Sequence, residues 1–153
     1  MKSKARFPTM LLITAGVVLV DHFIKQWFIY HYQLGESHAV TSFFSWTLVH
    51  NTGTAFGLLQ NNNRALLAIS YVILASFLYA ARGLWERARG WAFIGVSLIM
   101  GGAIGNIVDR HLYGHVIDFI DFHFWPVFNI ADSAITIGAI ATGIGLLFGS
   151  EKK

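Results

Sequence analysis

The chain has 153 residues, enough for one domain, and 55% of them are hydrophobic whereas only 12% are charged. This balance excludes an ordinary soluble globule and indicates an integral membrane protein. The formal net charge of +3 lies in short basic clusters beside apolar runs, a distribution that argues against a nucleic-acid partner. Because cysteine is absent, disulfides, thiol nucleophiles and thiolate metal ligands are excluded.

Four apolar runs predict four transmembrane helices, at about residues 8–30, 65–81, 91–108 and 126–148. Each has about 17 to 23 residues, and a membrane helix needs roughly 17 to 25. The first run is too long for a cleavable signal peptide and lacks a small-residue cleavage site. We therefore expect a single, mainly helical membrane domain over residues 1–153.

The basic residues predict the orientation of these helices. The N-terminus, the 82–90 connection and the C-terminus together carry eight of the eleven Lys and Arg residues. The 31–63 connection carries none, and the 109–125 connection carries only Arg110. By the positive-inside rule, both termini face the cytoplasm and the two longer connections lie outside.

The first outer connection, about residues 31–63, is too long to be structureless. Within it, the stretch VTSFFSWTLV (residues 40–49) partly alternates between apolar and polar residues. The residues expected to share its apolar face are Val40, Phe44, Trp46 and Leu48. We expect short strands that rest with this face on the membrane surface.

Polar residues that are costly inside a membrane gather at the outer side. Asp132 lies about 9 Å inside the fourth run if the helix starts at Pro126 and rises 1.5 Å per residue. No basic residue stands within one turn of it, and ionisable groups at such depth usually mark functional sites. The other polar residues at this level are Asp21, Lys25, Asn51, Asn106, Asp109, Arg110, Asp118, Asp121 and Asn129.

Several of these residues also have purely structural explanations. Asp21 and Lys25 are four residues apart on one helical face, so they fit a structural ion pair as well as a functional one. Asp109 fits a brace at a helix end, Asp121 fits a solvated or interfacial residue, and Asn129 fits a helix cap.

Asp118, in GHVIDFI, is the best partner for Asp132, because it also lies between apolar neighbours near the outer surface. Two carboxylates held close in a poorly solvated site cannot both ionise readily, so one keeps its proton and the pair titrates as a unit. Such a pair can activate water. Because the two residues lie on different segments, spacing alone leaves the pair and two unrelated carboxylates as open alternatives.

The chain resembles the lipoprotein signal peptidases (signal peptidase II), the bacterial membrane aspartyl peptidases that remove signal peptides from prolipoproteins. Five blocks carry the resemblance: DHFIK (21–25), NTGTAFG (51–57), GGAIGNIVDR (101–110), GHVIDFI (114–120) and FNIADSAI (128–135). They run in order from the first predicted span to the last. One departure is His22, where the family often has Gln after the first Asp.

The resemblance implies that Asp118 and Asp132 are the catalytic pair, which activates water to cleave before a cysteine that carries diacylglycerol. It implies that six residues line the pocket and hold the substrate or the pair: Asn51, Gly53, Asn106, Arg110, Asn129 and Ala131. Asp21, Lys25 and Asp109 are implied to support the site. The first outer connection is implied to form a β-cradle.

The same resemblance implies diacylglyceryl-prolipoprotein substrates, contact with membrane lipids and no cofactor or metal. It places the enzyme in the bacterial plasma (inner) membrane, with the active site near the extracytoplasmic face. Nothing in the sequence indicates an obligate protein partner.

Three other functions fit parts of the pattern. An ion- or proton-coupled transporter also uses buried Asp and Lys, but its polar residues cross the whole membrane, and here they stop at the outer half. The second is a metallopeptidase, whose metal ligands would be His111, His115 and Asp118; this is a weak ligand set, because the H-E-x-x-H motif is missing. A Ser–Lys peptidase would need a serine that faces Lys25, and Ser133 is a poor candidate.

Overall fold

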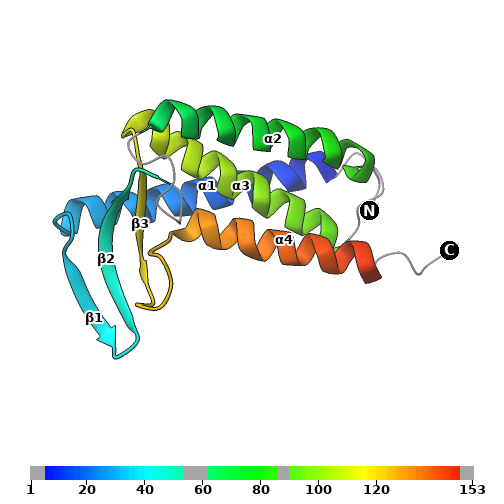
Figure 1. The fold of residues 1–153 in the computed structure, drawn as a ribbon. Helices are drawn as coiled ribbons and strands as arrows, with labels where there is room; N and C mark the ends of the chain where they lie inside the picture. Colours follow the sequence, from blue (N-terminus) through cyan, green and yellow to red (C-terminus); the bar gives the residue numbers. More distant parts are fainter. Residues whose placement is uncertain (1–5, 54–61, 86–89, 149–153) are drawn as a thin grey trace.

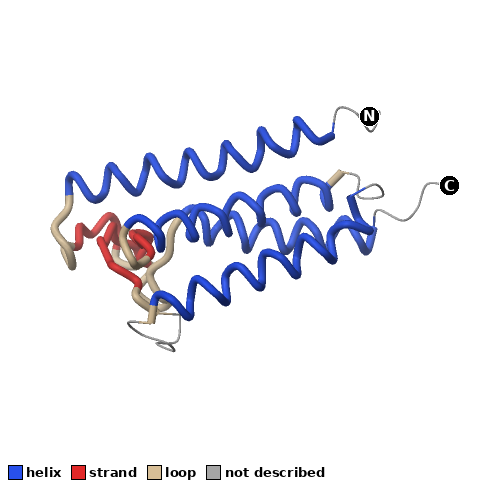
Figure 2. Tube along the Cα trace, turned by 90° about the horizontal axis from the view of Figure 1, so that it is seen from above, coloured by secondary structure: helices blue, strands red, loops and turns tan. Residues whose placement is uncertain are grey.

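The computed structural model describes residues 6–53, 62–85 and 90–148, which form four helices and a three-stranded sheet. The element order is α1 (Arg6–His31), β1 (Ser37–Thr41), β2 (Phe44–Asn51), α2 (Asn63–Trp85), α3 (Trp91–Leu112), β3 (Val116–Asp121) and α4 (Ile130–Phe148). The helices run side by side and the sheet lies at one end of them (Figure 1). Seen from above, α1 begins and α4 ends at the opposite end (Figure 2).

Within the residues that the structure describes, three helices are long and apolar enough to cross a membrane: α1 from Phe7, α3 and α4, with mean hydropathies of 1.8, 1.8 and 1.7. The described apolar part of α2, Asn63–Tyr79, is shorter. The mainly helical membrane fold is therefore confirmed, whereas the four-span count and the orientation of the termini stay predictions.

The sheet has the order β1-β2-β3, with both pairs antiparallel. The strands β1 and β2 confirm the expectation of short strands around residues 40–49. We did not expect β3, whose residues we assigned to a connection. It packs on α1 through a buried cluster in which the rings of Phe28 and Phe119 stack with their centroids 4.3 Å apart. Because side chains alternate along a strand, Asp118 lies on the face of β3 opposite Ile117 and Phe119.

The last helix begins at Ile130 rather than at Pro126. Phe128 is still paired with the sheet, since its N–H donates to the Ile120 carbonyl and its own carbonyl accepts from Ile120. Asn129 then caps the helix, because its side-chain oxygen accepts from the Asp132 N–H at 2.8 Å. Asp132 therefore lies in the first turn of α4, and the predicted depth of about 9 Å, counted at 1.5 Å per residue, was wrong.

The helix α3 is central, because it contacts α1, α2 and α4. Glycines of α3 allow α1 to approach closely on one side and α4 on another. A methyl group on Gly101 would meet Val17 of α1, and one on Gly102 would clash with the carbonyl oxygen of Ala131 in α4. The close approach of α3 and α4 brings Asn106 of α3 within hydrogen-bond distance of Asp132 of α4, at 2.7 Å.

We expect Gly102→Ala to lower the stability of the detergent-solubilised protein by about 1–3 kcal/mol, since backbone cannot yield as a flexible side chain can. The first turn of α4 must shift to accommodate the methyl group. Gly16→Ala is the matched control, because Gly16 is also helical but nothing lies within 4 Å of a methyl group there. Thermal unfolding measures both, and equal midpoints for the two variants would contradict the packing argument.

Candidate active site

A buried ammonium group lies at the centre of the polar cluster. Lys25 has no exposed surface, and its Nζ lies 2.6 Å from Asp21 Oδ2 and 2.7 Å from Asp109 Oδ2. Charges this deeply buried need such partners, because each loses its hydration. The ion cluster joins α1, which carries Asp21 and Lys25, to α3, which carries Asp109.

The two carboxylates of this cluster also hold the backbone beside the predicted catalytic pair. Asp21 Oδ1 accepts the N–H of Ala131 at 2.8 Å, immediately before Asp132. Asp109 Oδ2 accepts the N–H of Ile117 at 3.1 Å, immediately before Asp118. The predicted support residues Asp21 and Asp109 thus hold the backbone next to Asp132 and Asp118, and the fully buried Ala131 takes part in this support through its backbone N–H.

Asn106 connects Lys25 to Asp132. Its Oδ1 accepts a hydrogen bond from Lys25 Nζ at 3.2 Å, and its Nδ2 donates to Asp132 Oδ1 at 2.7 Å. An ammonium can only donate, so it fixes which end of the amide faces it. The amide nitrogen must then face Asp132.

Asn129 lies between the two aspartates. Its Oδ1 caps α4 as described above, and its Nδ2 donates to Asp118 Oδ1 at 2.6 Å and to Asn106 Oδ1 at 3.1 Å. One fully buried amide thus contacts Asp118 and the backbone of Asp132. The structure brings the predicted pair into one hydrogen-bonded network.

The second oxygen of Asp118 is held from the neighbouring strand. Asn51, at the end of β2, donates from Nδ2 to Asp118 Oδ2 at 2.8 Å and accepts from the Gly53 N–H at 3.1 Å. Arg110 in turn donates from Nη2 to the Gly53 carbonyl at 3.1 Å, and its Nη1 has no partner among the described residues. The rest of the NTGTAFG block, residues 54–57, lies outside the described ranges.

The environment of Asp118 favours its neutral form. Only 1% of this residue is exposed, and burial, followed by repulsion from the Asp132 carboxylate, raises the pKa of Asp118 to about 7. The donors Asn51 and Asn129 oppose this rise, because they stabilise the charged form. The pair can therefore hold one proton at neutral pH, which is the state that acid–base chemistry on water needs.

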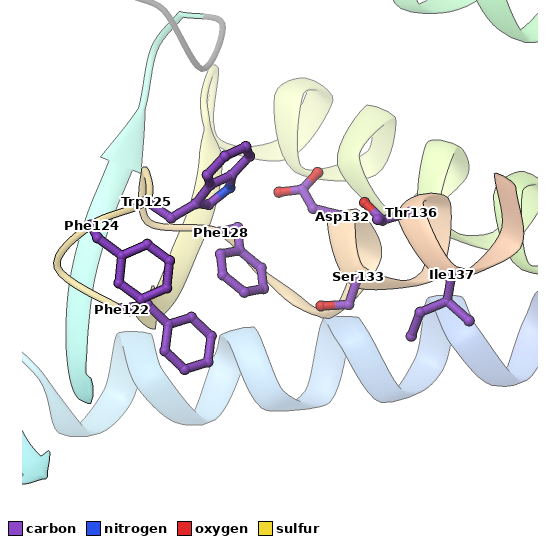
Figure 3. Close-up of a pocket in the computed structure, with 8 residues that line it drawn as sticks. All are labelled: Phe122, Phe124, Trp125, Phe128, Asp132, Ser133, Thr136 and Ile137. Carbon is purple, nitrogen blue, oxygen red and sulfur yellow. The ribbon is translucent and has the colours of Figure 1, made fainter. Parts of the chain in front are cut away.

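Two cavities open beside Asp132. One, which we call the polar cleft, has a volume of about 360 Å³ and lies against α2. Its lining combines polar groups, including Asn51, Gly53, Asn106 and Arg110, with apolar side chains of α2 and of the connection before α4. A second, more apolar groove of about 390 Å³ runs along the start of α4 (Figure 3). Trp125 and Phe128 line both cavities and were missed as site residues, although the aromatic run from Phe122 to Phe128 is visible in the sequence.

Asp121 has a structural place at the end of the sheet. Thr47 Oγ1 donates to its Oδ2 at 2.9 Å, and the N–H of His123 donates to its Oδ1 at 2.8 Å. His123 has a left-handed backbone, with φ 63°, and its ring contacts Ser45 at 2.8 Å. These contacts fix the turn after β3 and do not reach the aspartate pair.

The histidines and Ser133 are engaged elsewhere. His111 contacts the Tyr71 hydroxyl, and His115 stacks on His50 with the ring centroids 3.9 Å apart. Across the described ranges, no three metal-ligating side chains come together. Ser133 Oγ donates to the Asn129 carbonyl at 2.9 Å, while Lys25 is committed to its two carboxylates, so a Ser–Lys pair is not formed.

Most of the chain is similar to proteins of a known family. A family model described as signal peptidase (SPase) II matches residues 13–148. A lipoprotein signal peptidase from Janthinobacterium sp. (strain Marseille) is 45% identical over 138 residues, which cover 84% of this chain and 81% of that protein. One from Cupriavidus taiwanensis is 44% identical over 131 residues, 81% of this chain and 74% of that protein.

Solved structures show the same fold. A bacterial membrane enzyme determined by the in meso method at 2.3 Å resolution superposes with a TM-score of 0.81 at 35% identity, over 95% of this chain and 92% of that one. A second, at 1.9 Å resolution, gives 0.78 at 33% identity, over 94% and 95%.

We expect Lys25→Met to destabilise the protein by about 3–5 kcal/mol, because it leaves two carboxylates buried without their cation. Thermal unfolding in detergent measures this loss. The control is the triple variant D21N/K25M/D109N, which removes all three charges while the asparagine oxygens can still accept the backbone N–H groups of Ala131 and Ile117. It should recover much of the stability. A single variant as stable as the parent would contradict the central role of the ion cluster.

Proposed function

Because the chain belongs to the signal peptidase II family of aspartic-type hydrolases, we propose that it removes signal peptides from diacylglyceryl-modified prolipoproteins. Cleavage falls immediately before the lipidated cysteine. The family match does not favour the alternative of an ion- or proton-coupled transporter.

One observation carries the proposed mechanism: Asp118 and Asp132 share a single network of neutral amides beside the polar cleft. The pair holds one proton between its members. The ionised carboxylate takes a proton from a water molecule, whose oxygen attacks the scissile carbonyl carbon, and the protonated carboxyl donates its proton to the carbonyl oxygen. When the tetrahedral intermediate collapses, the C–N bond breaks and the nitrogen of the lipidated cysteine takes the proton that came from the water, which leaves a carboxyl group on the signal peptide. Asn106 and Asn129 keep the two groups aimed at the same point.

The polar cleft supplies donors for the peptide. Arg110 is only 8% exposed, and its Nη1, which has no hydrogen-bond partner in the described part of the chain, can donate to a substrate carbonyl. Asn51 and Gly53 line the same cleft and are tied to the dyad through Asp118. We assign binding of the signal peptide to this cleft, with Arg110 as its strongest fixed donor.

We place the site at the extracytoplasmic face of the bacterial inner membrane. Asp132 occupies the first turn of an apolar helix, and Asp118 lies in the sheet that adjoins this end of the bundle. At that level, acyl chains can remain in the bilayer while the scissile bond meets water. The basic clusters that the sequence carries at the N-terminus, in the 82–90 connection and at the C-terminus, read with the positive-inside rule, support this orientation.

We expect Asp118→Asn and Asp132→Asn each to lower cleavage of a diacylglyceryl precursor by at least about a hundredfold, since each removes one half of the acid–base pair. The near-isosteric amides should leave the protein folded and present in membranes. Cleavage by the purified enzyme is followed with the lipidated precursor and its unlipidated counterpart. Asp121→Asn is the matched control, since the Asp121 carboxylate binds Thr47 and the His123 N–H at the end of the sheet.

Wild-type-like cleavage by either dyad variant would remove the proposed mechanism. Equal cleavage of the lipidated and unlipidated precursors by the parent enzyme would contradict the substrate assignment while leaving the dyad intact.

We expect kcat/KM to fall as pH rises through about 7, because Asp118 then loses its proton and the pair no longer contains an acid. Asn51→Ala should move this alkaline limb to higher pH, since Asn51 stabilises the charged form and so lowers the pKa of Asp118. The measured quantity is the pH at the midpoint of this fall in kcat/KM, not the maximal value of kcat/KM. In the control Asp121→Asn, the midpoint should not move. If it does not move in Asn51→Ala either, the deprotonation of Asp118 does not cause the fall in kcat/KM.

A further inference from the structure

The apolar groove beside Asp132 has an aromatic wall and a helical wall. The connection after β3 supplies the aromatic rings, among them Phe122 and Phe128, and the first two turns of α4 supply Asp132, Ser133 and Thr136 (Figure 3). Its volume of about 390 Å³ is enough for a small organic group. The groove is separate from the peptide cleft but meets it at Asp132, which lines both.

Thr136 differs from the other hydroxyl residues of α4. Ser133 donates to the carbonyl of Asn129 at 2.9 Å, and Thr142 donates to that of Gly138 at 2.8 Å. Both follow the usual back-bonding of a hydroxyl to the preceding helical turn. Thr136 is exposed to the groove, and its side chain makes no hydrogen bond within the described ranges. A free donor in apolar surroundings is costly until a ligand accepts from it.

The charge of the groove restricts what it can hold. Among the described residues that line it, the Asp132 carboxylate is the one ionisable group, and none is Lys, Arg or His. A phosphate or carboxylate ligand would therefore find repulsion and no cation. A neutral group with apolar tails and carbonyl acceptors suits the aromatic wall and the free hydroxyl together.

We propose that this groove receives the ester-linked glycerol of the lipid on the substrate cysteine, and that the Thr136 hydroxyl donates to an ester carbonyl. The proposal rests on the function proposed above and adds its lipid subsite. The peptide in the polar cleft and the glycerol in the groove then converge on Asp132. This is where the bond before a lipidated cysteine has to lie, because the two parts of the substrate join at that cysteine.

The test compares two lipidated precursors on the purified full-length enzyme. One carries diacylglycerol, and the other carries a dialkylglycerol of equal chain length, in which ether links replace the esters and remove both carbonyls. We expect kcat/KM to be about threefold to tenfold lower for the ether substrate, as one hydrogen bond is lost. Thr136→Val, which keeps the shape but not the hydroxyl, should lower the ester rate by the same factor and leave the ether rate unchanged.

Thr136→Ser is the matched control, because it keeps the hydroxyl and should still prefer the ester. An equal loss on both substrates with Thr136→Val, or no loss on either, would overturn the proposal. So would a parent enzyme that cleaves the ester and ether precursors at the same rate, a result that needs no variant. In each of those cases the lipidated precursor is still cleaved, whereas failure of the proposed function would show as no cleavage of either precursor by the parent enzyme.

Discussion

The bridging of Lys25 between Asp21 and Asp109 is the interaction on which the rest of the site depends. It is buried, it joins α1 to α3, and each carboxylate uses a further acceptor position to hold a backbone N–H. Those N–H groups belong to the residues just before Asp118 and Asp132. The positions of the two aspartates are therefore set by Asp21 and Asp109, which bind the backbone one residue before Asp132 and Asp118 respectively.

This arrangement separates the cation from the carboxylates that are proposed to react. The donors that contact Asp118 and Asp132 directly are the neutral amides of Asn51, Asn106 and Asn129. An adjacent ammonium would favour ionisation of both carboxylates, whereas neutral amides orient the carboxylates and have a smaller effect on their ionisation. Lys25 reaches Asp132 only through Asn106. The site thus combines fixed geometry with a pair that can still share a proton.

Much of this could be predicted from the sequence. Apolar run length predicts the helices, and the presence of an ionisable residue in an apolar run marks Asp132 as functional even though its predicted depth was wrong; both predictions follow from the low polarity of the membrane. The start of α4 could not be placed, because the pairing of Phe128 with β3 is a long-range contact that overrides the apolar pattern from residue 126. The direction of the Asn106 amide depends on Lys25, 81 positions away in the sequence, and no local pattern records it. The sequence does not distinguish Thr136 from other threonines in apolar helices, because only the structure shows that its hydroxyl does not bond to the carbonyl of the preceding turn.

The place of α4 in the chain has a consequence for how the enzyme is made. Synthesis runs from the N-terminus, so α1, the sheet and α3 exist before α4 leaves the ribosome. The ion cluster of α1 and α3 can assemble at that stage, and with it a ready docking site for the Ala131 N–H. Asp132 and Asn129 arrive only with the last helix. On the proposed mechanism, a nascent chain that has not yet inserted α4 cannot hydrolyse its substrate, because it lacks one member of the aspartate pair in the site.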